Sequence, residues 1–388
     1  YNSRFILGIP NLHSYRISTY ISTLNLQFRM KRPLIFLLAL VGLWACKSEE
    51  ETPEEPQKPT SPVVFDLAEV PYEKLSDYNF FDGEMVDHDP VYGVIPYDVI
   101  TPLFADYSHK FRFVWMPEGA RATYNTDHNI LDFQDGTVLI KTFYFDNVQP
   151  EGNRYVIETR IEFMRNGQWE FAEYVWNEDQ TEAILDLDGS FKPLFYMDEN
   201  DEEKFVNWRV PSEAECLTCH KKDEAALPIG PKPQNINKDY NYPEGVRNQL
   251  LKLIDMGYLE PNIPANIETV VPWDDPSYPL QDRVRAYLDM NCAHCHRDNS
   301  HCDYRPVRYA WNETIDPENM GICVEPDQNL GQGLEEIIVP GNPDRSVLYF
   351  RINTSDEAVR MPLLGRSVIH EEGRDLILEY INSLEGPC

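Results

Sequence analysis

The sequence predicts an α+β protein of several domains, in which an antiparallel β-rich domain precedes mainly helical segments. Two patterns indicate this. Between residues 63 and 209, runs of alternating apolar and polar side chains are separated by tight turns, as in antiparallel strands. After residue 210, apolar side chains recur at the three- and four-residue spacing of helices. With 388 residues and 42% hydrophobic content, the chain has room for two or three domains with hydrophobic cores.

The clearest strand signal is a predicted hairpin. Residues 154–164 alternate, with apolar side chains on one face; the other face carries Glu158, Arg160 and Glu162. The pair Asn166-Gly167 is the preferred two-residue turn of a hairpin, so residues 169–176 are expected to return alongside. We expect residues 63–209 to form a sandwich-like antiparallel domain.

Four helices are expected after this region. Ser212 can cap a short helix, because Glu215 follows at the third position of a capping box. A second helix ends at Gly257; its apolar stripe consists of Val246, Leu250, Leu253 and Ile254. Residues 281–290 form a third amphipathic stretch, and a fourth follows Gly373, with an apolar face of Leu376, Ile377, Tyr380, Ile381 and Leu384.

The helical part contains two copies of a Cys-x-x-Cys-His run, which is the attachment signature of a c-type haem. On a helical turn, two sulfurs three residues apart lie on one side and can each form a thioether with a haem vinyl group. The next residue offers its imidazole to the iron. We therefore expect two covalent haem c groups, held by Cys216, Cys219 and His220 in the first motif and by Cys292, Cys295 and His296 in the second.

One such run alone could instead be half of a zinc site or a redox dithiol. Neither of these needs the histidine directly after the second cysteine. The gap between the two copies is also far longer than the roughly 15–20 residues that separate the halves of a zinc ribbon. Haem is the preferred interpretation, with zinc and dithiol sites as alternatives.

Residues 276–388 are expected to form a cytochrome c domain around the second motif. Two helices packed around a haem motif are the arrangement of small monohaem cytochromes c. Met361 follows His296 by about 65 residues, where such domains place the distal methionine, and Pro362 stiffens its loop. We expect Met361 to be the sixth ligand of this iron, with Met320 as the competing thioether.

The first motif lies in a shorter haem-binding segment, residues 210–275, where the sixth ligand is unsettled. Met256 is a weak candidate because it sits on the flank of an apolar stripe. His88 or His109 could reach over from the β-rich domain, or the position could be open. Three other histidines are expected to face solvent, namely His294, His301 and His370.

The amino-terminal residues 1–45 predict a lipoprotein signal peptide that begins at Met30. Its apolar run, residues 34–45, is too short to span a membrane. The run leads into Leu43-Trp44-Ala45-Cys46, which is similar to a lipobox, so Cys46 is expected to carry the lipid anchor. More than one acyl chain on that cysteine would make the anchoring stable.

Residues 46–62 are charged and proline-rich, and are expected to form a tether. The acidic run after Cys46 resembles the export signal of Bacteroidetes lipoproteins, which implies the outer membrane and surface exposure. The net charge of −31, without a basic stripe, excludes nucleic acid as a partner. It suits solubility or the docking of basic redox partners.

Eight cysteines are present, of which four belong to the motifs and one is the expected lipid site. Three remain, Cys302, Cys323 and Cys388. In an exported protein a leftover pair favours a disulfide over free thiols, and we expect it between Cys302 and Cys323. Cys388 receives no role.

With these motifs the chain resembles a family of bacterial dihaem c-type cytochrome lipoproteins, mostly of unassigned function, that join a β-rich amino-terminal domain to two Cys-x-x-Cys-His motifs. The resemblance covers about residues 96–384 and rests on residues 101–107, 215–220, 287–296, 339–343 and 360–365. It implies haem binding and electron transfer, and it names no substrate.

The sequence therefore favours an electron carrier of the cell envelope over an enzyme. Iron held by His296 and Met361 is coordinatively full, and a thioether ligand raises its potential. The main alternative is a dihaem peroxidase-like enzyme with an open first haem. A further alternative is a redox-active binding subunit of an outer-membrane complex.

Overall fold

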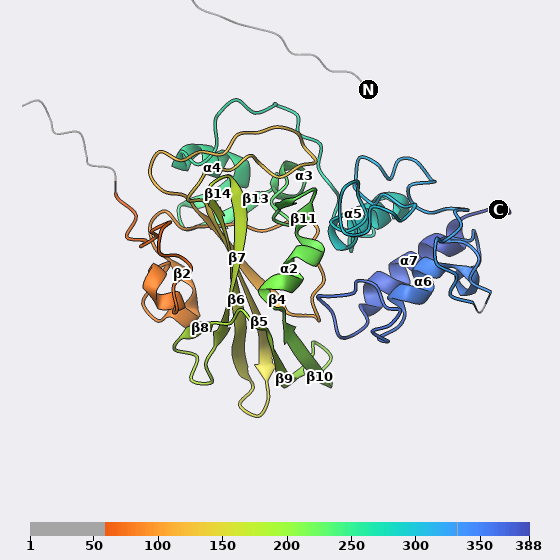
Figure 1. The fold of residues 1–388 in the computed structure, drawn as a ribbon, viewed down its shortest axis with the longest axis horizontal. Coiled ribbons are helices and arrows are strands. Elements are labelled where there is room, and N and C mark those ends of the chain that lie inside the picture. The colour runs from red at the N-terminus through yellow and green to blue at the C-terminus, as the bar shows by residue number, and fades with distance from the viewer. Residues whose placement is uncertain (1–58, 332) are drawn as a thin grey trace, which may run out of the picture. The chain divides into compact units, whose positions relative to one another are not determined.

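An antiparallel sheet of eight strands lies at the centre of the fold (Figure 1). The computed structural model describes residues 59–331 and 333–388. The signal peptide expected at residues 1–45, the lipid site at Cys46 and most of the tether at 46–62 lie outside the described residues. The strands are β3 (Ile95–Pro96), β4 (His109–Trp115), β5 (Val138–Val148), β6 (Asn153–Arg165), β7 (Gln168–Trp176), β8 (Ala183–Leu185), β9 (Ser190–Met197) and β10 (Glu203–Val210).

The predicted hairpin is confirmed. Strands β6 and β7 pair antiparallel with Arg165 opposite Gln168. The turn between them uses Asn166 at φ 53° and Gly167 at φ 73°, the positive angles that a tight hairpin turn of this type requires. The antiparallel β-rich region is thus present as expected.

The expected sandwich is wrong, because these strands form one sheet in the order β10-β9-β5-β6-β7-β8. Strand β4 also pairs with β5, along His109–Trp115, while β9 meets β5 only at its far end, where Val148 lies opposite Tyr196. Strand β5 is long and its register shifts twice along β6. Strand β5 therefore joins β9 and β10 to the strands β4, β6, β7 and β8, so that all of them belong to one sheet.

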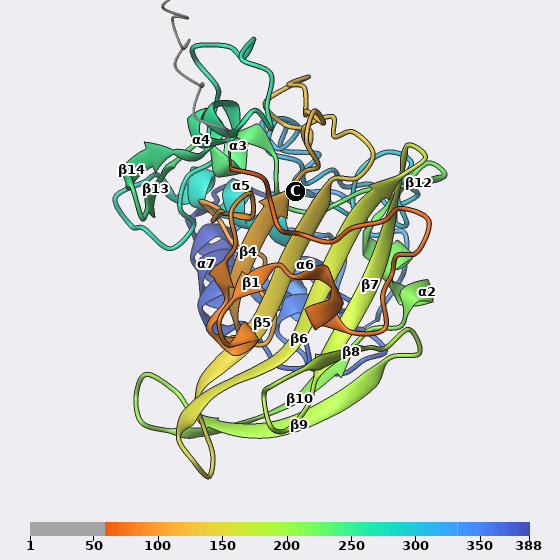
Figure 2. The same ribbon diagram turned by 90° about the vertical axis from the view of Figure 1, so that its left-hand side faces the viewer.

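One face of the sheet is covered by the segment before β4, which crosses it in Figure 2. This segment contains η1 (Leu75–Tyr78), β1 (Phe81–Asp82), η2 (Met85–Asp87) and β2 (Asp89–Pro90). Its apolar side chains pack on strand residues such as Ile140 and Ile161. The hydroxyl groups of Tyr78 and Tyr174 share a buried hydrogen bond of 2.8 Å. This mostly irregular segment thus covers the face of the sheet that a second sheet was expected to cover.

The other face of the sheet carries charged side chains that are buried. The alternation predicted for residues 154–164 holds from Glu158 to Phe163, whereas a bulge beside Tyr144 places Tyr155 and Ile157 on the opposite face from Ile161 and Phe163. On the charged face, Glu158 is 0% exposed and Glu162 only 9%. The neighbouring strand adds Glu173, which is 1% exposed. These carboxylates do not face water, because chain from the second half of the sequence packs over this face.

Eleven short elements follow the sheet in the described part of the chain. The helices are α2 (Glu213–Cys219), α3 (Pro233–Ile236), α4 (Gln249–Met256), α5 (Leu280–Asn291), α6 (Val347–Ile352) and α7 (Glu371–Ser383). The 3-10 turn is η3 (Pro343–Arg345), and two small hairpins are β11 (Lys221–Lys222) with β12 (Ala225–Ala226) and β13 (Asp239–Tyr242) with β14 (Gly245–Asn248).

The structure confirms most of the predicted helix ends. The capping box of Ser212 and Glu215 is present at α2, and Gly257 ends α4 in the left-handed conformation at φ 80°. The prediction for Val246 is wrong, since this residue belongs to β14 and is 68% exposed. Helix α4 begins only after Asn248, whose side chain accepts hydrogen bonds from two backbone N–H groups.

Helices α5 and α7 pack together, as predicted, around a core of Val284, Leu288, Leu376, Ile377, Tyr380 and Ile381. Gly373 lies where the two helices are closest, because a Cβ there would overlap the Tyr287 hydroxyl. The expectation of a mainly helical region is wrong. Apart from residue 332, which the structure does not describe, residues 292–342 contain no α-helix, and this stretch is rich in the Asn, Asp, Gly and Pro that favour turns.

Hydrogen bonds connect the segments that the sequence divides at residues 209 and 275. Thr101 bonds to Asn235 and to Val271, while Asp106 accepts hydrogen bonds from Ser367. Residues 59–388 accordingly cluster as one unit. Within the described part of the chain, no helix combines the length and the apolar character needed to cross a bilayer.

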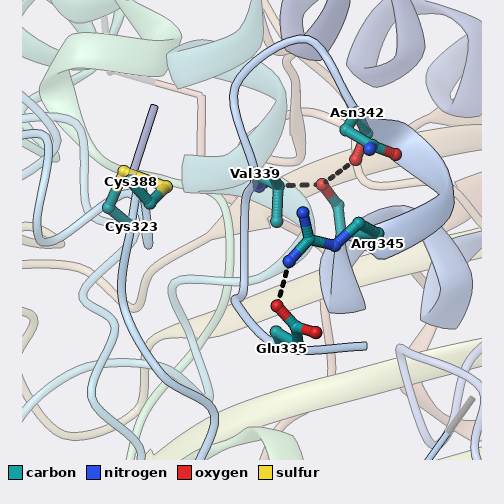
Figure 3. The surroundings of a disulfide bond; sticks show 7 residues. Cys323, Glu335, Val339, Asn342, Arg345 and Cys388 are labelled. Atoms are coloured by element: carbon teal, nitrogen blue, oxygen red, sulfur yellow. Dashed lines mark hydrogen bonds and ion pairs between the residues drawn. A yellow bond between two sulfur atoms is a disulfide. The ribbon is translucent and has the colours of Figure 1, made fainter. Parts of the chain in front are cut away.

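The disulfide joins Cys323 to Cys388, with a Cα–Cα distance of 5.2 Å (Figure 3). The predicted Cys302–Cys323 pair is therefore wrong. The tail after α7 returns to Cys323, which lies 65 residues earlier in the chain. Cys302 is a buried free thiol, and its backbone N–H donates to the Cys295 carbonyl at 3.2 Å.

Candidate functional site

The two Cys-x-x-Cys-His motifs are in contact. The Cys295 thiol lies 3.4 Å from the backbone oxygen of Thr218, inside the first motif. Donor atoms of Cys219, His294 and Cys295 all lie within 4.8 Å of one another. The folded chain thus brings both predicted cofactor sites to one place.

Local structure sets the direction of the first motif. Helix α2 follows directly after β10, and the Glu215 carboxylate of its capping box also forms an ion pair with Arg209 of that strand. The motif occupies the end of the helix, where His220 is the C-cap residue. Cys216 and Cys219 therefore project from one short helix that is anchored to the sheet.

The second motif continues from the end of α5. Cys292 caps this helix, and its carbonyl accepts hydrogen bonds from the N–H groups of Cys295 and His296, at 3.1 and 3.0 Å. This tight turn keeps the two cysteines and the histidine on the same pocket wall.

The pocket of the second motif has a volume of about 1260 Å³, including the open space at its mouth. Its wall is mostly apolar and includes Tyr287, Tyr309, Ile337, Val347 and Leu348. Met361 also lines it, so the structure brings Met361 and His296 to one pocket. Met320 is absent from the lining, because it is buried between α5 and α7, where the Tyr380 hydroxyl meets its sulfur at 3.6 Å.

The loop that carries Met361 is held by Arg366, which is 5% exposed. The guanidinium donates to the backbone oxygens of Met361 and Thr354, at 3.0 and 2.9 Å. It also donates to the carbonyls of Arg351 and Val368 at 3.1 Å. One buried cation thus fixes the backbone on both sides of the methionine.

His296 has the state that a metal ligand needs. Burial lowers its pKa to about 4, so the imidazole is neutral at physiological pH. Its Nδ1 atom is buried without a hydrogen-bond partner, and its ring packs on Tyr309 with centroids 5.4 Å apart.

The pocket of the first motif, which we call the first pocket, is similar in volume, about 1280 Å³, but charged in character. Cys216, Cys219 and His220 line one side of it. The sheet contributes Lys141, Arg160, Glu162 and Glu173, of which the alternating pattern had placed Arg160 and Glu162 on the charged face. The charged face of the sheet is therefore a wall of this pocket.

His220 is oriented by the backbone. Its Nδ1 atom bonds to the Leu227 carbonyl at 2.9 Å, which leaves Nε2 available to a metal. Burial, with a smaller contribution from nearby Lys141, lowers the pKa of His220 to about 3. The imidazole is thus neutral, and the Glu162 carboxylate lies 3.9 Å from Nδ1.

Among the described residues, the cysteines do not gather into the closed four-ligand set of a structural zinc, although Cys219, His294 and Cys295 match the three protein ligands of an open zinc site. The Cys216 thiol instead donates to a Glu173 oxygen at 2.9 Å. Burial raises the pKa of Cys216, and raises that of Cys292 to about 12, so both stay protonated.

Three expected candidates for the sixth position of the first iron do not line the pocket of the first motif. Met256 ends α4 and lines neither motif pocket. His88 stacks on Phe111 in the core of the sheet, and His109 is exposed, 3.8 Å from Asp146.

Two histidines expected in solvent are instead at the pockets. His294 is 8% exposed and lines both of them. His370 has a side chain that is 13% exposed, stacks on Phe104 and shares a 3.0 Å hydrogen bond with Tyr287. His301 is exposed, as expected. No local sequence signal distinguishes these three histidines, because only contacts with distant segments bury the first two.

Comparisons of this chain with protein-family models, with curated proteins and with solved structures gave no match.

Proposed function

We propose that this chain is a dihaem c-type cytochrome that transfers electrons as a lipoprotein of the cell envelope. The observation that carries the proposal is that two Cys-x-x-Cys-His motifs touch, each on the wall of its own large pocket. Haem, when bound, supplies a one-electron iron couple. Everything else in the proposal concerns what the chain's own residues do.

The residues fit two covalent haem groups. Cys216 and Cys219 would hold the first with His220 as ligand, and Cys292 and Cys295 would hold the second with His296 and Met361 as ligands. Each motif lines a pocket, and the wall beside the second motif is mostly apolar, as a flat macrocycle requires. The imidazole of His220 is oriented by the hydrogen bond between its Nδ1 atom and a backbone carbonyl. The Nδ1 atom of His296 is buried without a partner, so no hydrogen bond orients that ring.

The pocket of the second motif is suited to the relay of electrons. Its apolar wall excludes water from the ligands, and Arg366 holds the Met361 loop in one conformation. A ligand set that stays in place in both oxidation states allows an electron to pass without rebuilding the site. Thioether ligation also favours the reduced state. The second site would therefore be the higher-potential end of the pair.

The lipobox-like segment, the disulfide and the net charge support the proposed cellular location and partners of the chain. The lipobox-like segment ending at Cys46 supports a lipid anchor, and the Cys323–Cys388 disulfide is typical of an oxidising compartment. We assign the chain to the cell envelope as an outer-membrane lipoprotein. Its net charge of −31 favours basic redox proteins as partners.

Haem content tests the proposal. The protein is produced in a host that attaches haem c, and its mass and pyridine haemochrome spectrum are measured. We expect two haems in the wild type and one in each double variant, Cys216→Ala with Cys219→Ala, or Cys292→Ala with Cys295→Ala. Cys302→Ser is the matched control, because this pocket cysteine lies outside the motifs, and it should retain both. A colourless wild-type protein with stoichiometric zinc would refute the assignment.

The charged wall of the first pocket favours one alternative, a peroxidase-like enzyme. Glu162, Glu173, Arg160 and Lys141 could move protons or stabilise charge on a bound oxidant. This function needs an open sixth position on the first iron. A high-spin ferric signal together with peroxide turnover would support the enzyme, whereas two low-spin signals without turnover would support the carrier.

A further inference from the structure

His294 belongs to the second motif by sequence, and its side chain lines the pockets of both motifs. It stands between Cys292 and Cys295, and a donor nitrogen of its ring lies within 4.8 Å of the Cys219 sulfur. The residue is 8% exposed, and its Nδ1 atom is buried without a hydrogen-bond partner. Buried imidazole nitrogens are normally paired, so this one is unusual.

The first pocket offers few other ligands for iron. Apart from His220, His294 supplies the only imidazole among the described residues of its wall, and none of them supplies a thioether. The remaining nitrogen donor is the Lys141 amine, which lies among the charged side chains of the sheet and over the Phe143 ring at 5.2 Å. A neutral imidazole is the commonest nitrogen ligand of metals in proteins.

We propose that His294 and His220 would both hold the iron of the first haem. The inference rests on the proposed function, since it requires haem at the first motif. Coordination would give the buried ring nitrogen a partner. It would also close the position that a peroxidase-like reaction needs, and so would make the first site a second relay station.

This ligand would connect the two sites covalently. Cys292 and Cys295 would be bonded to the second haem, and His294 lies between them in the chain while it reaches the iron of the first. The first site would have two histidines and the second a histidine with Met361. Because a thioether raises the potential relative to a second imidazole, electrons would flow from the first site to the second.

The test is electron paramagnetic resonance of the ferric holoprotein, with spectra of wild type, His294→Ala and two controls. We expect two low-spin signals in the wild type. His294→Ala leaves the Cys-x-x-Cys-His spacing intact and should convert one of the two signals to high spin. Added imidazole should restore it, and His301→Ala, an exposed histidine just beyond the motif, should change nothing.

A second variant covers the case in which His294→Ala is unstable. His294→Met should keep the first iron low-spin while raising its midpoint potential. Two low-spin signals in His294→Ala, a high-spin signal in the wild type, or loss of a low-spin signal in Lys141→Gln in place of His294→Ala would each overturn the inference. These outcomes all require two bound haems, so they are distinct from failure of the proposed function, in which no haem is found.

Discussion

Protonation of His88 should destabilise the folded protein in mild acid. This histidine is 4% exposed, its Nδ1 atom bonds to the Val86 carbonyl at 2.8 Å and its Nε2 atom bonds to the Thr142 hydroxyl at 3.2 Å. Burial lowers its pKa from the ordinary 6.5 to about 4. His88 therefore becomes protonated below pH 6.5 in the unfolded chain, but only below about pH 4 in the folded protein.

The magnitude follows from the shift. A difference of about 2.5 pKa units corresponds to about 3 kcal/mol, at about 1.4 kcal/mol per unit, and most of it is lost between pH 6.5 and 4. Between pH 7 and 4.5 the loss is about 2.5 kcal/mol. Above pH 6.5 the group has no effect, and below pH 4 the loss does not grow further.

Urea unfolding of the wild type and of His88→Gln at pH 7 and pH 4.5 measures this loss. The variant keeps a polar side chain but cannot titrate, so its stability should fall by about 2.5 kcal/mol less over that interval. His301→Gln, at an exposed histidine, should match the wild type. Stability profiles of wild type and His88→Gln that run parallel would refute the buried, neutral state of His88.

Three further predictions concern the second motif and its support. Met361→Ala should lower the midpoint potential of one haem and abolish its methionine-to-iron charge-transfer band, which optical titration would detect; an unchanged band would exclude Met361 as ligand. Gly373→Ala should cost about 1–3 kcal/mol in thermal unfolding, because the added Cβ overlaps the Tyr287 hydroxyl, and an unchanged melting temperature would contradict that close packing. Cys388→Ser should cost about 4 kcal/mol, since the disulfide to Cys323 spans 65 residues, and disulfide mapping should find no alternative bond.

Local patterns in the sequence predicted local structure well. The Asn166-Gly167 turn, the capping box at Ser212 and the end of α4 at Gly257 all depend on a few adjacent residues. The packing of α5 on α7 was also predictable, because each helix has one apolar stripe and each needs a partner for it. The Cys-x-x-Cys-His motifs belong to the same class, as both are complete within five residues.

Other features depended on segments that are distant in the chain. Alternation in β6 identified a charged face, yet the sequence could not tell whether water or a pocket lies against it. The sandwich failed for the same reason, since irregular chain covers the other face of the sheet. Among three leftover cysteines, no local pattern ranks Cys388 above Cys302 as the partner of Cys323.

The sequence by itself identified the residues to which we assign the cofactors, because thiol spacing and the adjacent histidine are properties of a short covalent run. Only the tertiary structure decided what surrounds them. It brought the two motifs into contact, placed Met361 and His296 in one pocket, and buried His294, expected at the surface, where it lines the pockets of both motifs. Such placements result when segments that are distant in the chain bury their apolar and polar groups together. The free energy of that burial depends on the whole fold and not on any short stretch of sequence.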